Sequence, residues 1–531
     1  MKLLRKLLFP LLILLLLCQP VLAADFSRLV ILHTNDTHGY DEYGDGHNGM
    51  AVIASLKQEL ESQGYDVLLL DAGDAIQDNN LVNFSKGHSA IRFMNAAGYD
   101  AATIGNHEFD YGQDVLQQLM SEALFPYVAA NILVDANGKT FTRPYVILQK
   151  GDVKIGIVGL TTPQTITSTS PKNVYGLTFL QGRQLWRVTE LAVDEMKRQG
   201  CDLIIALGHL GSEPDCTGNR SEDIAEQVDG IDIVIDGHDH LVKNSYIGST
   251  LLAETGCYTR NIGRITYEDG RWTENMLPFG EYTQEKPDVK LLVQTVRDQV
   301  NASLGQVVGT SLVNLDGSRV PGVRTMETNA GDFCADALLW QAQKANVLDG
   351  PVDASICNGG SIRSGIAPGN ITRSMLYSMH PYNNQLCIVK ITGRKLLEIL
   401  EAATAFTPEA MGAFPQTSGI RYTIDTSVPY EKGELYPASS YYAPANPGSR
   451  ITIDTVGGRS FRAEDIYTIA LVEYLAIGGD TYAGLCLPGA KLEYRSVGYL
   501  DVEALENYLT EELHGEIGLN YAASQGRITI R

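Results

Sequence analysis

The sequence predicts a two-domain α/β protein, and three observations support this prediction. The chain has 531 residues, which is too long for one hydrophobic core, because single cores stop growing at about 250–300 residues. Apolar runs of strand length alternate with helix-like segments in the first half, as in layered α/β domains. Several of these runs end in clusters of Asp, Asn and His, which indicates a ligand site beyond the carboxyl ends of the strands.

The strands expected in the first half are short apolar runs, separated in places by amphipathic segments. The two clearest helices are expected at residues 52–63 and 186–199. The apolar runs lie at 29–32, 67–70, 101–104, 155–160, 203–207 and 231–235. Together they predict a first domain over residues 25–284.

A long amphipathic pattern separates the two halves of the chain. Residues 285–305 carry apolar side chains at helical spacing up to Gly305, which predicts a linker helix. Beyond it, helices are expected at 338–345 and 395–403, and strands at 387–391 and 466–471. This alternation predicts a smaller α/β domain over residues 306–531.

The first 24 residues have the pattern of a secretory signal. Lys2, Arg5 and Lys6 precede an apolar run at 7–17, and small residues follow up to Ala23. That run is short for a membrane span, and no later stretch is long enough to cross a bilayer. We therefore expect an exported protein, periplasmic or extracellular, with no transmembrane span in the mature chain. Retention of the segment as an anchor is the alternative.

Charge restricts the classes of partner. The formal net charge is −22 for the whole chain, and it becomes −25 when the three basic residues of the signal are removed. A surface this acidic repels polyanions, so long nucleic acid is excluded as a partner. A small anionic substrate remains compatible if metal ions and a few arginines form a local positive pocket. We expect the chain to act as a monomer on such a substrate.

Five polar clusters follow the apolar runs of the first half. They hold five of the ten histidines of the chain, and His33 lies beside the first cluster. A single such cluster is usually a turn or a helix cap, but five at successive strand ends can converge on one site. The donors are oxygen and nitrogen atoms without thiolate, which favours Zn²⁺, Mn²⁺, Fe or Co²⁺ over Ca²⁺ or Mg²⁺. The clusters are TNDTH (34–38), DAGD (71–74), GNHE (105–108), GH (208–209) and GHDH (237–240).

The motifs resemble those of a known family. LHTNDTHG (32–39), GNHEFDYG (105–112), GHLG (208–211) and GHDH (237–240) resemble the calcineurin-like metallophosphoesterases, and more narrowly the bacterial and animal 5′-nucleotidases. NGGSIR (358–363) and YLAIGGD (474–480) extend the resemblance into the second half. It implies a calcineurin-like metallophosphoesterase domain, a layered β-sandwich flanked by helices, followed by an α/β domain that binds the nucleoside.

The resemblance also implies a centre of two divalent metal ions, of Zn, Mn, Co or Fe. Asp74 would bridge the two ions. Some relatives carry Gln in place of His240, which leaves the metal preference open. The first ion would be held by Asp36, His38, Asp74 and His240, and the second by Asp74, Asn106, His209 and His238.

The remaining matched positions concern catalysis and substrate. His107 would act on the phosphoryl group, and Asp110 would fix its tautomer. Tyr382 and Tyr474 would sandwich the base, as phenylalanines do in many relatives. The role of Arg324, near a position where some relatives carry a further arginine, stays open. The other implied substrate-binding residues are Asn358, Arg363, Asn384 and Asp480.

The leading hypothesis is therefore a secreted, metal-dependent phosphoric monoester hydrolase of nucleotide catabolism, which releases phosphate from nucleoside 5′-phosphates by attack of a metal-activated water. The main alternative is a 2′,3′-cyclic-nucleotide 2′-phosphodiesterase/3′-nucleotidase, or a bifunctional enzyme. Relatives of that type often have Asn in place of Asp110. A non-nucleotide hydrolase is disfavoured by the aromatic pair and Arg363. A non-catalytic nucleotide-binding protein is disfavoured because every matched position is filled.

Overall fold

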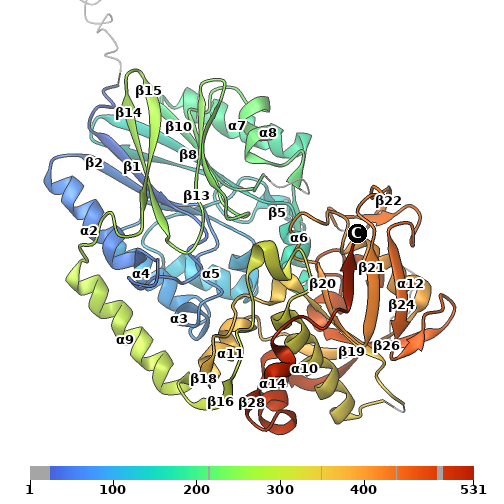
Figure 1. Cartoon of the computed structure of the whole chain (residues 1–531). Coiled ribbons are helices and arrows are strands. Elements are labelled where there is room, and N and C mark those ends of the chain that lie inside the picture. Colours follow the sequence, from blue (N-terminus) through green and yellow to red (C-terminus); the bar gives the residue numbers. More distant parts are fainter. Residues whose placement is uncertain (1–23, 213–215, 349, 438, 487–493) are drawn as a thin grey trace, which may run out of the picture.

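The computed structural model of the chain describes residues 24–212, 216–348, 350–437, 439–486 and 494–531. The expected signal falls almost wholly on residues 1–23, outside the described residues. Two lobes follow one another along the chain, the first blue to green and the second yellow to red in Figure 1. Within the described residues, no helix combines the length and the apolar composition that a membrane span requires.

The first lobe is built on two six-stranded sheets. One sheet has the order β15-β14-β1-β2-β3-β4, and the other has the order β12-β13-β11-β10-β8-β7. The strands of the first sheet are β1 (Leu29–Thr34), β2 (Asp66–Asp71), β3 (Ala101–Thr103), β4 (Tyr127–Val128), β14 (Asn261–Glu268) and β15 (Arg271–Pro278). Those of the second are β7 (Tyr145–Lys150), β8 (Val153–Thr161), β10 (Leu203–His209), β11 (Ile233–Ile235), β12 (Val242–Ile247) and β13 (Thr250–Thr255).

The central parallel strands, such as β1, β2, β10 and β11, are buried on both faces, which explains why they read as continuous apolar runs. In β1, Ile31 belongs to the core between the two sheets, whereas Val30 and Leu32 belong to the core under the helices. This alternation follows from the two-residue period of a strand. The helices over the first sheet include α2 (Gly49–Ser62), α4 (His88–Ala97) and α5 (Gln113–Glu122), and those over the second are α7 (Arg183–Arg198) and α8 (Ser221–Gln227).

The parallel strands end at a common edge, and this places the polar clusters together. Strand β1 is parallel to β2, with Thr34 opposite Asp71. Strand β10 is parallel to both β8 and β11. The loops after these strands therefore start from the same edge of the sandwich.

Helix α9 (Pro287–Leu304) lies within the segment expected to be helical, and it runs along the outside of the molecule (Figure 1). Its buried side chains are Val289, Val293, Val296 and Val300, spaced three or four residues apart. This stripe packs into the core of the first lobe beside α2 and α4. The chain then enters the second lobe at β16 (Val307–Ser311).

The second lobe is built on a five-stranded sheet of order β20-β17-β26-β19-β27. Helices α10, α11 and α14 pack on one face, and α12 with a four-stranded sheet (β25-β24-β21-β29) packs on the other. The central sheet contains β17 (Ala354–Asn358), β19 (Gln385–Thr392), β20 (Pro415–Ser418), β26 (Ile466–Val472) and β27 (Tyr494–Leu500). The helices are α10 (Asn329–Ala345), α11 (Arg373–Met379), α12 (Gly393–Ala402) and α14 (Asp501–Asn507), and the second sheet holds β21 (Ile420–Ile424), β24 (Ile451–Val456), β25 (Arg459–Ser460) and β29 (Ile528–Ile530).

The structure confirms the α/β fold class, and individual elements differ from expectation in length. Helix α10 begins nine residues before the segment expected at 338–345. Its first turn contains Gly331, which disfavours helix, but the hydroxyl of the N-cap residue Thr328 accepts the N–H of Gly331 at 3.0 Å. The hairpin of β14 and β15, which extends the first sheet beyond β1, is not predicted by the sequence pattern at all.

Candidate metal and substrate site

The polar clusters meet in one buried site, and the backbone there is unusual. Asp36, His38, Asp74, His238 and His240 all have positive φ, between 48° and 97°. This region is sparsely populated by residues other than glycine, and such strain gathers at functional sites. The turns after the strands are therefore shaped to present these side chains.

Asp36, His38 and His240 form one group of possible metal donors. Nε2 of His38 lies 3.2 Å from Nε2 of His240. The other ring nitrogen of His38, Nδ1, lies 2.9 Å from the carbonyl oxygen of Gln77. Because a carbonyl oxygen only accepts, Nδ1 must carry the proton. The Nε2 atom of His38 is then a lone-pair donor that points at a second imidazole nitrogen, and a cation between them satisfies both.

Asp74, His209 and His238 form a second group, and Asp74 also belongs to a group with His38 and His107. Oδ2 of Asp74 lies 3.0 Å from Nε2 of His209 and 4.0 Å from Nε2 of His38. Nδ1 of His238 lies 2.9 Å from Oδ1 of Asn106. Asp74 thus stands between the two groups, as the expected bridging role requires.

The residues fit divalent ions in a further respect. The buried Oδ1 of Asp36 makes no hydrogen bond within the described part of the chain. It has His240 Nε2 at 3.4 Å and His38 Nε2 at 3.8 Å. A buried carboxylate oxygen without a donor is costly, and a cation among these three side chains removes the cost.

Electrostatics keep four of the donors in the forms that bind metal. Burial lowers the pKa of His38 and of His240 well below the ordinary value, and it lowers the pKa of His238 to about 4. Burial alone would raise the pKa of Asp74, but His209 and His107 outweigh it and hold that pKa well below the usual range. Neutral imidazoles and an ionised carboxylate are the forms that ligate metals. His209 differs, because burial alone would lower its pKa, but the charge of Asp74 outweighs burial and raises that pKa well above the ordinary value.

Glu108 ties two of the ligand loops together. Its buried carboxylate accepts the N–H groups of Asp74 and Ala75, each at 2.9 Å, and that of Gly105 at 2.7 Å. Burial raises the pKa of Glu108 to about 7. The GNHE motif therefore supplies Asn106, His107 and the side chain that holds the loop after β2 in register with the loop after β3.

His107 and Asp110 lie side by side at the edge of the metal donors. Nδ1 of His107 is 2.6 Å from Oδ2 of Asp110, and the backbone N–H of His107 donates to Asp74 Oδ1 at 2.8 Å. Burial lowers the pKa of His107, but the charges of Asp110 and Asp74 outweigh it and raise that pKa overall. The arrangement favours a charged imidazole whose Nε2 faces the metal donors.

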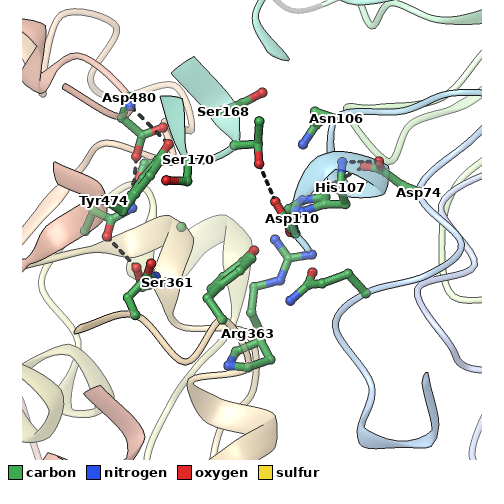
Figure 2. Close-up of a pocket in the computed structure, with 18 of the residues that line it drawn as sticks. Asp74, Asn106, His107, Asp110, Ser168, Ser170, Ser361, Arg363, Tyr474 and Asp480 are labelled. Carbon is green, nitrogen blue, oxygen red and sulfur yellow. Dashed lines mark hydrogen bonds and ion pairs between the residues drawn. The ribbon is translucent and has the colours of Figure 1, made fainter. Parts of the chain in front are cut away.

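A cleft between the two lobes joins the metal donors to the second domain (Figure 2). Arg363 reaches from the second lobe to the first, where its Nη2 lies 3.0 Å from Oδ2 of Asp78. Both side chains are buried. Arg319 and Arg324 also line the cleft. The structure thus gathers three guanidinium groups at the metal site, two of which the sequence motifs left unassigned.

The far end of the cleft is formed by residues of the second lobe. Asn358 donates to Oδ2 of Asp480 at 2.9 Å. The backbone N–H of Asp480 donates to the hydroxyl of Tyr474 at 3.0 Å. Gly479 lies flat against the Tyr474 ring, because a Cβ atom there would be 2.2 Å from a ring carbon. Three predicted substrate residues therefore form one connected wall.

Tyr382 and Asn384 also line the cleft. The Tyr382 ring stacks on the His107 imidazole, with centroids 5.8 Å apart and planes inclined by 25°. The structure places Tyr382 and Tyr474 in the same cleft, and the base sandwich between them stays a prediction. His33, in contrast, lies outside the site, with its Nε2 3.1 Å from Glu274 Oε2.

A buried polar network that the sequence did not reveal supports this wall from behind. Sγ of Cys357 lies 3.7 Å from Nε2 of His380, and Nδ1 of His380 lies 3.3 Å from Oδ2 of Asp501. The backbone N–H of Asp501 donates to the carbonyl oxygen of Asn384 at 2.9 Å. Because Cys357 precedes Asn358 and His380 lies two residues before Tyr382, the network fixes the backbone on both sides of the cleft.

Comparison with family models assigns both lobes. Residues 29–242 match the calcineurin-like phosphoesterase model, and residues 307–485 match the model of the 5′-nucleotidase C-terminal domain. The chain belongs to the 5′-nucleotidase family. As a member of this family it is a metal-dependent phosphoric monoester hydrolase.

Individual relatives agree over nearly the whole chain. A 5′-nucleotidase of Vibrio cholerae is 27% identical over 95% of this chain and 94% of its own length. The trifunctional nucleotide phosphoesterase protein YfkN of Bacillus subtilis is 30% identical over 91% of this chain, which spans only 34% of that longer protein. The solved structure of a 5′-nucleotidase precursor from Thermus thermophilus superimposes with a TM-score of 0.79, at 26% identity, over 94% of this chain and 99% of its own.

Proposed function

We propose that this chain is an exported nucleoside 5′-phosphate phosphohydrolase that works with two divalent metal ions. The observation that carries the proposal is the single cleft that joins the two groups of metal donors, His107 and the wall of Asn358, Tyr474 and Asp480. A substrate with phosphate at one end and a nucleoside at the other suits both ends of this cleft.

The first ion would be held by Asp36, His38, Asp74 and His240, and the second by Asp74, Asn106, His209 and His238. When bound, the ions would neutralise the phosphate charge and lower the pKa of a water molecule, so that it becomes a nucleophile at neutral pH. Zn, Mn, Co and Fe all suit this mixture of oxygen and nitrogen donors.

The protein residues then supply orientation and charge. His107, charged and held by Asp110, donates a hydrogen bond from Nε2 to the phosphoryl group or to the leaving oxygen, where negative charge grows in the transition state. Arg363 offers a planar fork to the phosphate, which replaces its ion pair with Asp78. Tyr382 and Tyr474 bind the base. Asp480 accepts hydrogen bonds from the ribose hydroxyls, and Asn358 and Asn384 position the nucleoside.

A 2′,3′-cyclic nucleotide phosphodiesterase activity is the second candidate. The specific observation in its favour is the 30% identity to a protein named as a trifunctional nucleotide phosphoesterase. Asp110 favours the monophosphate substrate, because it is Asp rather than the Asn often found in cyclic phosphodiesterases.

Phosphate release from AMP and from 2′,3′-cyclic AMP, measured with the same purified chain, distinguishes the candidates. We expect kcat/KM for AMP to exceed that for the cyclic nucleotide by at least about tenfold, equivalent to about 1.4 kcal/mol. The Asp114→Asn variant, altered on the exposed face of α5, serves as a control for purification and metal loading. A larger kcat/KM for the cyclic nucleotide would overturn the proposal.

A further inference from the structure

One segment of the first lobe lies between the nucleoside wall and the catalytic pair. It comprises residues 164–170 and includes the short helix α6 (Thr165–Ser168). Figure 2 shows Ser168 and Ser170 of this segment between Tyr474 and Asp480 on one side and Asp110 and His107 on the other. None of the expected site residues comes from it.

The second lobe docks on this segment at one backbone atom. The carbonyl oxygen of Thr167 accepts the hydroxyl of Tyr474 at 2.5 Å and the backbone N–H of Asp480 at 2.8 Å. Both donors belong to the wall expected to bind the nucleoside. The position of that wall is therefore coupled directly to the backbone of the first lobe.

Two residues further on, the same segment contacts the catalytic pair. The hydroxyl of Thr169 donates to Oδ1 of Asp110 at 2.7 Å. Thr169 is 2% exposed, so this hydrogen bond is shielded from water. Since Oδ2 of Asp110 contacts Nδ1 of His107, the carboxylate is held on both oxygens and cannot rotate away from the imidazole. Without Thr169, one carboxylate oxygen of Asp110 would lose this donor.

The segment is stiff enough to connect the two contacts. The N–H groups of Thr167 and Ser168 both donate to the carbonyl oxygen of Gln164 at 2.8 Å, and the hydroxyl of Thr165 donates to the carbonyl oxygen of Thr162 at 2.7 Å. The side chain of Gln164 lies 2.8 Å from Nε2 of the expected metal ligand His238. Fixing Thr167 therefore restricts where Thr169 can lie.

We propose that Thr169 is a positioning residue for the His107–Asp110 pair, and that residues 167–169 transmit docking of the nucleoside wall to that pair. The second part rests on the proposed function, because it assigns Tyr474 and Asp480 to a nucleoside. Docking of the second lobe then does more than complete the pocket, since it also aligns the imidazole for phosphoryl transfer.

Thr169→Val tests the first part, because valine keeps the shape of threonine and removes the hydroxyl. We expect kcat to fall roughly tenfold for both AMP and p-nitrophenyl phosphate, about the effect of one hydrogen bond to a charged group, with KM changed less than about twofold. Thr169→Ser, which restores the hydroxyl, should recover most of kcat. The matched control is Thr178→Val, which removes a surface hydrogen bond of the same kind, from Thr178 to Asp135 at 2.7 Å, and should leave kcat unchanged.

Equal loss of kcat in Thr169→Val and Thr169→Ser would show that packing alone matters and would overturn the positioning role. A Thr169→Val variant with wild-type kcat would overturn it as well. Failure of the proposed function has a different signature: the wild-type chain would hydrolyse p-nitrophenyl phosphate and leave AMP intact. The threonine series on p-nitrophenyl phosphate would still test the role of Thr169 in that case.

A double-mutant cycle tests the transmission. Tyr474→Phe keeps the ring and removes the hydroxyl that reaches Thr167. We expect it to lower kcat for AMP roughly threefold, within the range of one neutral hydrogen bond, and to have no effect on kcat when Thr169 is already Val. Independent effects that multiply in the double variant would contradict transmission through residues 167–169.

Discussion

At the scale of single residues, the candidate metal donors could be picked out from the sequence, because each lies at the end of a strand or in the short turn that follows it. The geometry of Asp36, His38 and Asp74 is set within a few residues of β1 and β2. Asp78 and Thr169 could not be found in this way, since their partners Arg363 and Asp110 lie 285 and 59 positions away in the sequence. Nothing in the pattern around a threonine or an aspartate shows such a distant contact.

Asp74 is the residue whose loss should disturb the metal centre most, because it stands between both donor groups. We expect Asp74→Asn to abolish turnover and to lower the metal content of the purified chain, since the neutral amide lacks the negative charge with which the carboxylate would bind two cations. Metal analysis and phosphate release from AMP, compared with Asp114→Asn, check this. Two metals per chain and near-normal activity in Asp74→Asn would refute the ligand assignment.

His107 should affect chemistry without affecting metal binding. We expect His107→Ala to lower kcat by roughly 10²–10⁴, the range for a positioned acid–base or oxyanion group, with metal content near that of the wild type. The surface residue His88, whose Nδ1 lies 2.8 Å from Glu122, provides the control variant His88→Ala. If His107→Ala lost metal but kept turnover per remaining loaded enzyme, His107 would be a ligand instead.

At the scale of elements, the buried parallel strands were the easiest to predict, because burial on both faces makes them continuously apolar. The edge hairpin β14–β15 mixes polar and apolar residues, including Arg264, Glu274 and Asn275, and lacks that signal. The ligand loops depend on contacts between elements, and Glu108 shows how: one side chain after β3 holds the backbone after β2. The motif GNHE indicates a functional turn but not this connection.

Glu108→Gln tests the connection between the two loops. The amide keeps the size of the side chain. However, its NH₂ group must replace one of the two oxygens that accept backbone N–H groups, so that two donors face each other. We expect a loss of about 1–3 kcal/mol of stability and weaker metal retention, measured by thermal unfolding and by metal content after dialysis. Glu122→Gln, at a surface ion pair, should change neither. An unchanged melting temperature and full metal retention would contradict this role of Glu108.

At the scale of the whole molecule, the proposed function requires both lobes to bind one substrate. The metal donors come from the first lobe and the aromatic residues from the second, and Arg363 crosses between them to Asp78. The order of the two domains follows from the motifs. Their relative placement does not, because it depends on side-chain contacts such as that of Arg363 and on the packing of the α9 valines.

The two tyrosines should therefore matter only for substrates that carry a base. We expect Tyr382→Ala and Tyr474→Ala each to weaken AMP hydrolysis by roughly 1–3 kcal/mol, the scale of base–aromatic stacking. Hydrolysis of p-nitrophenyl phosphate should change far less. The two effects need not add, since both rings would contact one base. Equal losses on both substrates would show that the tyrosines serve the fold, and an unchanged rate with AMP would exclude this nucleoside pocket.

We propose above that a two-metal centre in the first lobe hydrolyses a nucleotide bound by the second lobe. The most direct test of this proposal is a titration of the metal-free chain with Mn²⁺ or Zn²⁺, in which phosphate release from AMP and bound metal are measured in the same samples. We expect negligible turnover without metal and a rate that reaches its plateau at two ions per chain. Full turnover of AMP in the metal-free chain, or a plateau at one ion, would contradict it.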